Sequence, residues 1–293
     1  MKSLRLPAFA KINTCLYVLG RRPDGYHELR TIFQTIGLHD TLEMSLTRRA
    51  GVELECDNPA LSAGRDNLVW RAVSAARRAL GMRAGVKVKL EKRIPVARGL
   101  GGGSSDAAAA LLGVERLAGR SLDPGRRFAI AAKLGSDVPF FLFGGRALGM
   151  GRGEEVYPVP EEPKRFVVVV SPAGIAVSTR EAYTWLRAAA LTTRGSARKL
   201  KCFCALCWSG QGSFENDFEV PVFRRHPRLA RLKRAFFEHG AAGVALAGSG
   251  SAVFGVFQTP AQARRAAIEF PDDQVFITET VSREEYRRAM GWR

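Results

Sequence analysis

A run of glycines directly before an alanine-rich segment constrains this chain more than any other feature. Four of the five residues at 99–103 are glycine, and Ser104–Asp106 then leads into Ala107–Leu117. Glycine lets the backbone turn through positive φ and come close to an anion, which a Cβ would obstruct. The serines and the aspartate are favourable N-cap residues, and the alanine-rich segment has high helix propensity. The sequence therefore predicts a loop that opens into a helix N-terminus, where free N–H groups and the helix dipole favour bound phosphate.

This loop matches neither of two widespread nucleotide-binding motifs. No Gly-Lys-Ser/Thr follows it, as a Walker A loop requires, and it is not the G-x-G-x-x-G at the end of a short strand. The alternative interpretation is a flexible linker before an ordinary amphipathic helix. Three consecutive glycines followed by two capping serines are more elaborate than a linker needs, which favours the phosphate loop.

The charge balance makes polyanions candidate partners. Among 293 residues, 45 are Lys or Arg and 28 are Asp or Glu, which gives a net charge of +17. Nucleic acid is therefore one candidate, and steering of an anionic substrate is another. The basic residues are spread over many segments, which indicates a generally basic surface, and we expect no nucleic-acid partner.

Cysteine usage and hydropathy favour a cytoplasmic protein. No run reaches the ~18 apolar residues of a membrane span, and no signal-peptide pattern opens the chain. An odd count of five cysteines fits reduced thiols. Cys202, Cys204 and Cys207 form C-x-C-x-x-C, but their segment is basic and lacks an obvious fourth ligand. We expect incidental thiols there, in a long loop at 192–212, with metal binding as the alternative.

The first strand carries two polar side chains that can reach one ligand. Side chains alternate from Ala8 to Leu19, which predicts a strand with Lys11 and Asn13 on the same face. Lys11 could equally protect a sheet edge. The turn at 23–25 then places Tyr26 and His27 at the start of the next strand, suited to stacking and hydrogen bonding but also common as ordinary strand residues.

The remaining pattern predicts an α+β chain in two parts. A proline-rich linker at 158–164 suggests domains at 1–158 and 159–293. Asp137 lies in a tight turn after a helix that Gly135 ends, and an N-cap is its plainest interpretation. The order β-α-α-β-β-α-β in the second part is typical of a split β-α-β sandwich with helices on one face. Further strands are expected at 42–46, 52–54, 86–90, 166–170, 244–246, 252–257 and 274–280, and helices at 68–76 (capped by Asp66-Asn67), 127–134, 178–190, 227–239 and 260–270.

Taken together, these motifs resemble the GHMP small-molecule kinases over about 7–257. The glycine loop is shared by that superfamily, whereas Ala-Lys-Ile-Asn and Asp-Gly-Tyr-His are narrower markers of kinases that act on a cytidine diphosphate-linked sugar alcohol. The motifs that carry the resemblance, in chain order, are Ala8–Asn13, Pro23–His27, Asp66–Leu68, Pro95–Asp106, Leu134–Pro139 and Gly248–Ser251.

The resemblance implies a fold and a reaction. The fold is a ribosomal-protein-like N-terminal domain and a ferredoxin-like C-terminal domain, with the site in the cleft between them. The reaction is transfer of the γ-phosphoryl group of ATP, with Mg²⁺, to the 2-hydroxyl of 4-(cytidine 5'-diphospho)-2-C-methyl-D-erythritol, in the non-mevalonate route to isoprenoid precursors. We expect a monomer or a weak homodimer.

The resemblance also assigns residues. It implies that Asp137 is the general base with Lys11 beside it, which suits phosphoryl transfer, where positioning and charge stabilisation dominate. Arg98 stands where the family more often has a small residue, so it either contacts phosphate or points away. No magnesium ligand is implied. ATP would be bound by Asn67 and by Pro95, Val96, Ala97, Arg98, Gly99, Leu100, Gly101, Gly102, Gly103, Ser104 and Ser105, and the second substrate by Asn13, Tyr26, His27 and Tyr183.

Two alternative functions remain. Another kinase of the same superfamily, of the homoserine, mevalonate or galactose type, would share the loop and the base. The pair Tyr26-His27 discriminates against these, since only a nucleobase needs a stacking ring and a group that reads its edge. A basic nucleic-acid-binding protein would explain the charge, but it would need neither the loop nor a paired lysine and aspartate.

Overall fold

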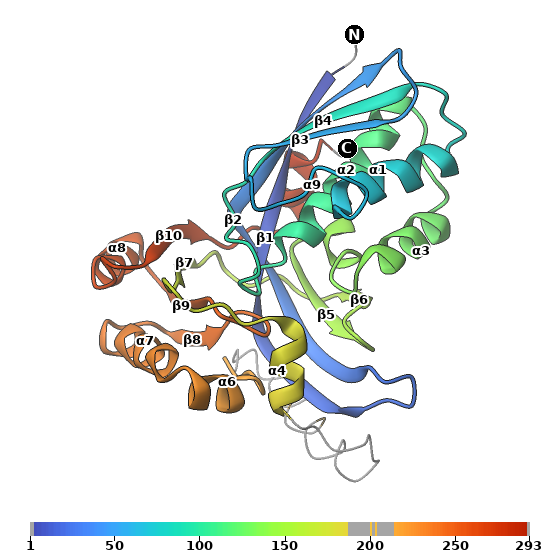
Figure 1. The fold of residues 1–293 in the computed structure, drawn as a ribbon. Helices are drawn as coiled ribbons and strands as arrows, with labels where there is room; N and C mark the ends of the chain where they lie inside the picture. The colour runs from blue at the N-terminus through green and yellow to red at the C-terminus, as the bar shows by residue number, and fades with distance from the viewer. Residues whose placement is uncertain (1–2, 187–199, 201–202, 204–213, 292–293) are drawn as a thin grey trace.

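Two long strands, β1 (Ser3–Arg21) and β2 (His27–Thr47), run through the centre of the fold (Figure 1). The computed structural model describes residues 3–186, 200, 203 and 214–291. The strands pair antiparallel along their length, with register shifts at three places, and Gly25 takes φ 85° in the turn between them. The strand predicted from Ala8 to Leu19 is thus confirmed as part of the longer β1, although nearly all of its side chains are buried and do not alternate in exposure. The sequence predicted one strand that starts at Tyr26-His27 and a separate strand at 42–46, but a single continuous strand is found.

The other strands of the first sheet pair with β2 or with its neighbours. The strand order in this sheet is β3-β4-β2-β5-β6, and β1 pairs with β2 in addition. Strand β2 pairs with β5 near its start and with β4 near its end, and β3 lies parallel to β4. These strands are β3 (Val52–Cys56), β4 (Gly85–Glu91), β5 (Arg146–Met150) and β6 (Glu155–Pro158).

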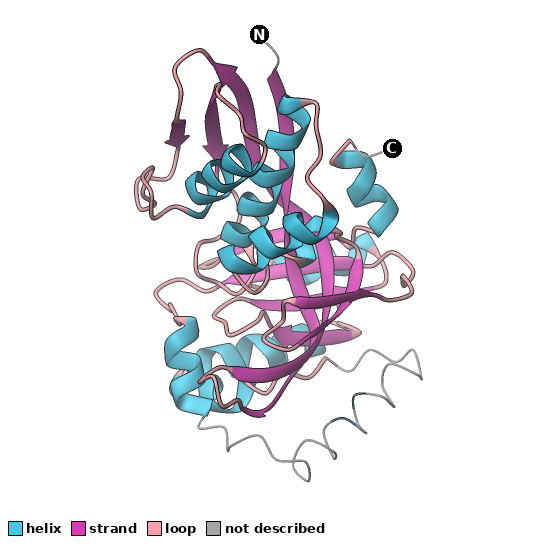
Figure 2. Ribbon diagram, turned by 90° about the vertical axis from the view of Figure 1, so that its right-hand side faces the viewer, coloured by secondary structure: helices cyan, strands magenta, loops and turns pink. Residues whose placement is uncertain are grey.

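Helices α1 (Leu68–Ala79), α2 (Gly102–Ala118) and α3 (Pro124–Leu134) pack together beside the first sheet (Figure 2). Helix α2 is the central one, since it contacts β1, β2 and both other helices. Its alanines at 107–110 are all buried, and small side chains allow this close approach. At Gly113 an ideal Cβ would lie 2.3 Å from the sulfur of Met44.

The start of α2 corrects one prediction. The helix begins at Gly102, and its N-cap is Gly101, in the left-handed conformation with φ 73° and with no side-chain cap. Ser104, Ser105 and Asp106 therefore lie inside the first turns and do not cap the helix. Glycine can adopt this conformation at little cost, so the turn is made by the backbone before the serines are reached. The predicted cap at Asn67 is confirmed, because its side chain accepts from the backbone N–H of Val69.

The second sheet is antiparallel throughout and has the order β10-β7-β9-β8. Its strand β7 (Phe166–Ser171) is apolar without alternation because both faces are buried. Val167 and Val169 face the first sheet, whereas Val168 and Val170 face the helices on the other side. The remaining elements here are β8 (Gly243–Leu246), β9 (Val253–Phe257), β10 (Gln274–Glu279), α4 (Thr179–Leu186), α6 (Glu219–Arg225), α7 (Pro227–Glu238) and α8 (Pro260–Ala267).

The predicted split β-α-β sandwich is confirmed, with α6 as an additional helix that the sequence pattern did not reveal. The predicted loop at 192–212, including Cys202, Cys204 and Cys207, lies outside the described residues except for positions 200 and 203. No helix in the described ranges is long and apolar enough to cross a membrane.

The last helix, α9 (Arg283–Ala289), returns to the first sheet. Its Tyr286 is buried, lies 5.5 Å from the ring of Phe9 between centroids, and donates a hydrogen bond of 2.5 Å to the carbonyl of Phe141. The domain division at 158/159 stays a prediction. Helix α9 follows this division in the sequence but packs on the core of the first sheet, which precedes it.

We expect Tyr286→Ala to lower the free energy of unfolding by about 3–5 kcal/mol, because it removes a buried aromatic ring and leaves a cavity. Urea denaturation measures the change. Tyr157→Ala is the matched control, since Tyr157 is 50 % exposed, and it should change stability by less than about 0.5 kcal/mol. Equal losses in both variants would contradict this role of α9.

Candidate active site

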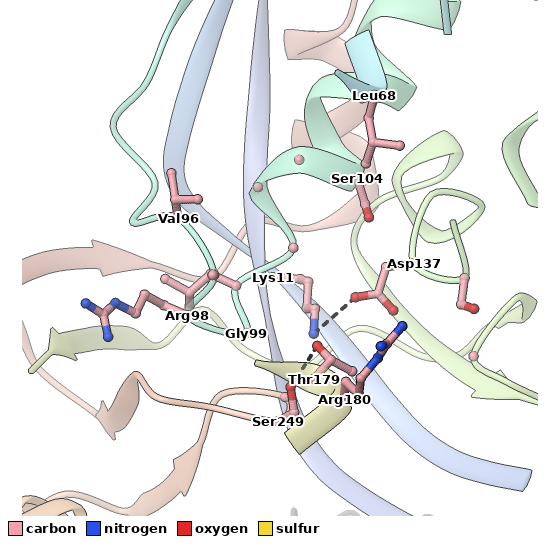
Figure 3. Close-up of a pocket in the computed structure, with 18 of the residues that line it drawn as sticks. Lys11, Leu68, Val96, Arg98, Gly99, Ser104, Asp137, Thr179, Arg180 and Ser249 are labelled. Carbon is pink, nitrogen blue, oxygen red and sulfur yellow. Dashed lines mark hydrogen bonds and ion pairs between the residues drawn. The ribbon is translucent and has the colours of Figure 1, made fainter. Parts of the chain in front are cut away.

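A cavity of about 1320 Å³ lies between the first sheet, the glycine loop and the start of α4 (Figure 3). Strand β1 contributes Lys11 and Asn13, and the turn before the 3₁₀ helix at Phe140–Leu142 contributes Asp137. Thr179 and Arg180 enter from α4, and Ser249 from the loop after β8. The cavity thus joins residues that are far apart in the sequence.

Lys11 and Asp137 form an ion pair at the centre of this cavity. The Lys11 Nζ lies 3.4 Å from Asp137 Oδ2 and donates a hydrogen bond of 2.8 Å to Asn13 Oδ1. The Lys11 side chain is only 4 % exposed, whereas that of Asp137 is 33 % exposed. Asn13 is itself held, because its Nδ2 donates to Thr31 Oγ1 at 2.7 Å. A buried, oriented cation therefore stands beside a carboxylate that solutes in the cavity can reach.

The glycine loop lies directly against Lys11. The backbone N–H of Lys11 donates to the carbonyl of Leu100 at 3.0 Å. At Gly101 an ideal Cβ would come within 2.8 Å of Phe141 Cζ and 3.0 Å of Lys11 Cγ. At Gly99, which has φ 81°, it would come within 1.8 Å of the Ala247 carbonyl oxygen. Glycine is required at both positions because the loop packs tightly between β1 and the second domain.

The structure places nearly all the predicted ATP residues in the cavity wall. Ser104 lines the cavity, but Ser105 does not, and its buried Oγ has no hydrogen-bond partner among the described residues. Asn67 also lines the cavity, while its side chain is engaged with Val69 N and with the carbonyl of Ser62. The other predicted ATP residues that line the cavity are Pro95, Val96, Ala97, Arg98, Gly99, Leu100, Gly101, Gly102 and Gly103.

A contact between the two halves of the molecule explains the orientation of the Arg98 side chain. Its Nη1 donates a hydrogen bond of 2.6 Å to Ser251 Oγ, which in turn donates to the carbonyl of Ile175. In Figure 3 the guanidinium points away from Lys11 and Asp137. The side chain therefore fastens the glycine loop to the second domain.

Aromatic side chains gather at the other end of the cavity. His27 stacks on Tyr183, with centroids 4.5 Å apart and planes at 24°, and Tyr183 meets Phe218 edge-on. Burial and, secondarily, the charge of Arg21 lower the pKa of His27. Neutral imidazole has one donor and one acceptor, which suits the edge of a base. Burial raises the pKa of Tyr183, and the charge of Asp137 adds to this.

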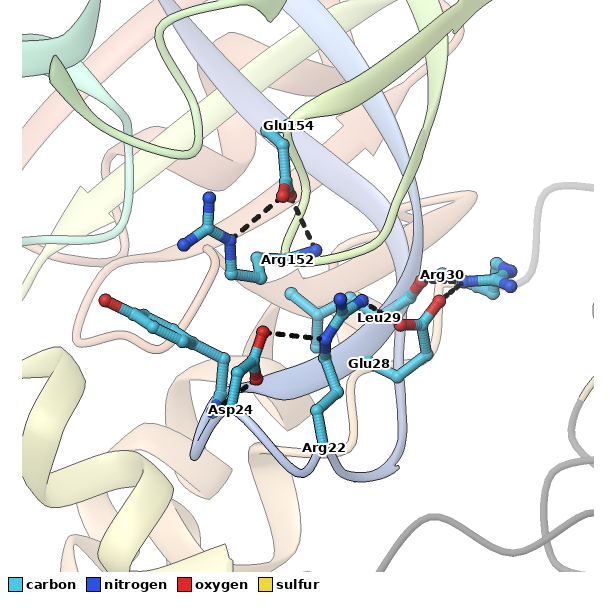
Figure 4. A network of polar contacts seen from close by, with 8 residues as sticks. Arg22, Asp24, Glu28, Leu29, Arg30, Arg152 and Glu154 are labelled. Atoms are coloured by element: carbon cyan, nitrogen blue, oxygen red, sulfur yellow. Dashed lines mark hydrogen bonds and ion pairs between the residues drawn. The ribbon is translucent and has the colours of Figure 1, made fainter. Parts of the chain in front are cut away.

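Arg152 and Arg180 are charged cavity residues that the sequence did not reveal as part of the site. The guanidinium of Arg152 lies 4.7 Å from the ring centroid of Tyr26, which is 55 % exposed. Glu154 accepts hydrogen bonds from the Nε and the backbone N–H of Arg152 (Figure 4). Among the described residues, the two Nη groups of Arg152 have no hydrogen-bond acceptor. Figure 3 shows Arg180 pointing toward Asp137. Neither could be singled out in a chain so rich in arginine.

Comparison with known proteins places the chain in a family. Models of the GHMP kinases N terminal domain and of the GHMP kinases C terminal match residues 67–145 and 196–272. The 4-diphosphocytidyl-2-C-methyl-D-erythritol kinase of Solibacter usitatus (strain Ellin6076) is 46 % identical over 96 % of this chain and 90 % of its own. The chain belongs to the GHMP kinases. The enzyme of the same name from Geobacter sp. (strain M21) is 42 % identical, over 92 % of this chain and 95 % of its own.

Solved structures agree with the assignment of this chain to the GHMP kinases. A crystal structure of 4-(cytidine 5'-diphospho)-2C-methyl-D-erythritol kinase, 36 % identical, superposes with a TM-score of 0.78 over 94 % of this chain and 99 % of its own. Homoserine kinase from Cytophaga hutchinsonii ATCC 33406 reaches 0.76 over 96 % and 95 %, at 17 % identity, and shares the fold alone. The α+β fold with two GHMP kinase domains, implied by the resemblance, is confirmed.

We expect Gly99→Ala to destabilise this GHMP kinase by more than about 1 kcal/mol, because alanine is strained at positive φ and the Cβ would meet the backbone of Ala247. Gly103→Ala is the matched control, since Gly103 lies inside α2 and the nearest atom to its ideal Cβ is 3.7 Å away. Alanine favours a helix there. Thermal unfolding of both variants measures the difference, and equal stabilities would show that the loop is not tightly packed against Ala247.

Proposed function

We propose that this GHMP kinase phosphorylates the 2-hydroxyl of 4-(cytidine 5'-diphospho)-2-C-methyl-D-erythritol with ATP. The observation that carries the proposal is the ion pair of Lys11 and Asp137 between two unlike ends of one cavity. One end is a glycine loop suited to a triphosphate, and the other is an aromatic cluster around His27 suited to a nucleobase. The relatives named above act on this substrate by name, which agrees with the arrangement.

Asp137 is proposed as the group that orients the attacking hydroxyl and accepts its proton. Its carboxylate is accessible from the cavity, as a base must be in order to reach the hydroxyl. Lys11 stabilises the negative charge that develops on the hydroxyl oxygen as the proton leaves. Because Lys11 is buried and held by Asn13, its ammonium is already oriented before substrate arrives.

ATP is proposed to lie along residues 95–104, with its phosphates at the start of α2. The loop offers backbone N–H groups, and Ser104 adds a hydroxyl at the cavity wall. Asn67 is proposed to line the adenosine end as part of the α1 cap, since its amide is already engaged within the fold.

Magnesium belongs to the same proposal. Within the described residues no group of three or more His, Cys, Asp or Glu side chains could hold a metal ion. Mg²⁺ at a nucleotide usually takes one or two carboxylates and otherwise phosphates and water. The phosphates of ATP and water would therefore hold most of the ion's coordination positions, and the ion would neutralise phosphate charge.

The second substrate is proposed to place its cytosine at the aromatic end. His27 reads the base edge, and Tyr26 and Tyr183 enclose its faces. Asn13 contacts the sugar alcohol beside Lys11. Arg152, whose guanidinium already covers one face of Tyr26, is suited to the diphosphate. Homoserine or mevalonate would leave these aromatic groups unused.

The wider setting is also part of the proposal. We propose a cytoplasmic enzyme, a monomer or a weak homodimer, whose partner is this small molecule and not nucleic acid.

An ADP-release assay with the cytidyl substrate, homoserine and mevalonate tests the function. Turnover with the cytidyl substrate alone supports it, and turnover with either of the others in its place contradicts it.

We expect Asp137→Asn to lower kcat by about 10²–10⁴-fold with little change in KM for ATP, because an amide cannot accept the proton. Steady-state kinetics measure both constants. Asp272→Asn, an exposed residue outside the cavity wall, is the control and should match the unmodified enzyme. Near-normal kcat in the first variant would remove Asp137 from the role of base.

We expect Tyr26→Ala to raise KM for the cytidyl substrate, because a stacking face is lost, while KM for ATP is unchanged. Tyr26→Phe keeps the ring and should restore the lower KM. Tyr157→Ala, which removes an exposed tyrosine outside the cavity wall, controls for the loss of a surface ring. An unchanged KM in Tyr26→Ala would exclude stacking on this ring.

A further inference from the structure

Three charged side chains that the proposed mechanism does not use are buried beneath the glycine loop. Lys92 Nζ donates to Asp106 Oδ2 at 2.7 Å and also to Asp40. The three side chains are 5 %, 3 % and 0 % exposed, in that order. Surface ion pairs are common and weak, but a lysine between two buried carboxylates is costly unless it is well paired.

These residues, which we call the loop clamp, hold both ends of the glycine loop. Lys92 directly follows β4 and precedes the loop, and Asp106 lies in the first turns of α2, where the loop ends. Asp40 comes from β2 and is fixed in the sheet. The clamp therefore sets the distance between the strand that leads into the loop and the helix that leaves it.

Asp40 also holds the backbone of the entering segment. Its Oδ1 accepts from the N–H of Arg93 at 2.5 Å and of Ile94 at 2.8 Å, the two residues before Pro95. At Gly102 an ideal Cβ would lie 3.1 Å from Ile94 Cγ2 and 3.3 Å from Lys92 Nζ. The absence of a side chain at this position lets the start of α2 lie close to Lys92 and Ile94.

Asp106 accepts a hydrogen bond from Lys92 through Oδ2, and its side chain is buried. Burial raises the pKa of Asp106 to about 8, the Asp40 carboxylate acts in the same direction, and Lys92 opposes both. The Oδ1 of Asp106 has no hydrogen-bond partner among the described residues. An asparagine could make the same bond to Lys92.

Stability alone is a weak explanation for this arrangement. Uncharged side chains of similar volume often stabilise a core as well as a buried ion pair does. The hydrogen bonds of the clamp are directional, and they fix the two ends of a loop whose backbone N–H groups have to point at one ligand. Lys92 and Asp106 also line the cavity wall at this place.

We propose that Asp40, Lys92 and Asp106 are positioning residues for the nucleotide, which preorganise the glycine loop for phosphate before ATP arrives. This rests on the proposed function only in taking the loop as the ATP site. The identity of the phosphate acceptor does not enter, so a direct measurement of ATP binding without a second substrate tests it independently.

The test compares the Kd for ATP, measured by calorimetry, in Lys92→Met and in Lys87→Met. The control, Lys87, lies on β4 and pairs with Glu55 at 2.6 Å, but its side chain is 33 % exposed. We expect Lys92→Met to weaken ATP binding by about tenfold or more, comparable to losing one hydrogen bond to a charged group. Lys87→Met should bind as the unmodified protein does. Normal ATP affinity in folded Lys92→Met would overturn the proposal.

A double variant covers the case in which Lys92→Met does not fold. Lys92→Met with Asp40→Asn removes the buried ammonium and the Asp40 carboxylate together. Without Lys92, burial favours the neutral form of Asp106. The asparagine oxygen at position 40 can still accept from the N–H groups of Arg93 and Ile94. We expect the double variant to fold and to bind ATP as weakly as the single variant. Amide hydrogen exchange should then be faster at 99–103 and unchanged in α1 and α3. Unchanged exchange in the loop, or normal affinity, would overturn the proposal.

The conservative variant tests the part assigned to Asp106. We expect Asp106→Ala to weaken ATP binding and Asp106→Asn to restore it to within about threefold of the unmodified protein, because the amide oxygen accepts from Lys92. In steady-state kinetics the losses should fall on KM for ATP and spare KM for the second substrate. If Asp106→Asn binds ATP as poorly as Asp106→Ala, the carboxyl group acts as a charge and this assignment is wrong.

Discussion

The burial of Lys11 at the meeting point of three chain segments is the constraint on which the site depends. Its backbone N–H holds the glycine loop through Leu100, and its side chain contacts Asn13 and Asp137. Because β1 fixes this residue by pairing with β2 on both sides of position 11, the loop and the carboxylate are placed relative to a sheet. Two separate motifs thereby become one site.

The two sheets share the long strands as a common support. Residues of β1 and β2 contribute to the core under α2, to the core between the sheets, and to the core of the second domain. An inter-domain cavity can keep its shape only if the domains are held together. Here Arg98, bonded to Ser251, and α9, packed through Tyr286, fasten the halves at further points.

Local patterns were enough to predict much of this molecule. Alternation placed Lys11 and Asn13 on one face, and Asn67 was identified as a cap, because each depends on neighbours within a few residues. The start of α2 was predicted wrongly, since serines are common caps and only the backbone at Gly101 reveals the true one. The contacts of Arg98, Tyr286 and Lys92 join distant segments, and no local pattern encodes such a partner. The catalytic assignments came from family resemblance and stay predictions.

The surroundings of the Lys11 ammonium suit its proposed role. An ammonium has three donors, and within the described residues two oxygens approach Nζ, those of Asn13 and Asp137. Gly248, with φ 53°, is a near neighbour of the ammonium, since an ideal Cβ there would lie 3.3 Å from Nζ. Gly248 and Lys11 both line the cavity, and the absence of a side chain at position 248 leaves room for another atom beside the ammonium. An oxygen that gains negative charge during phosphoryl transfer would find there a buried cation already oriented by two neighbours.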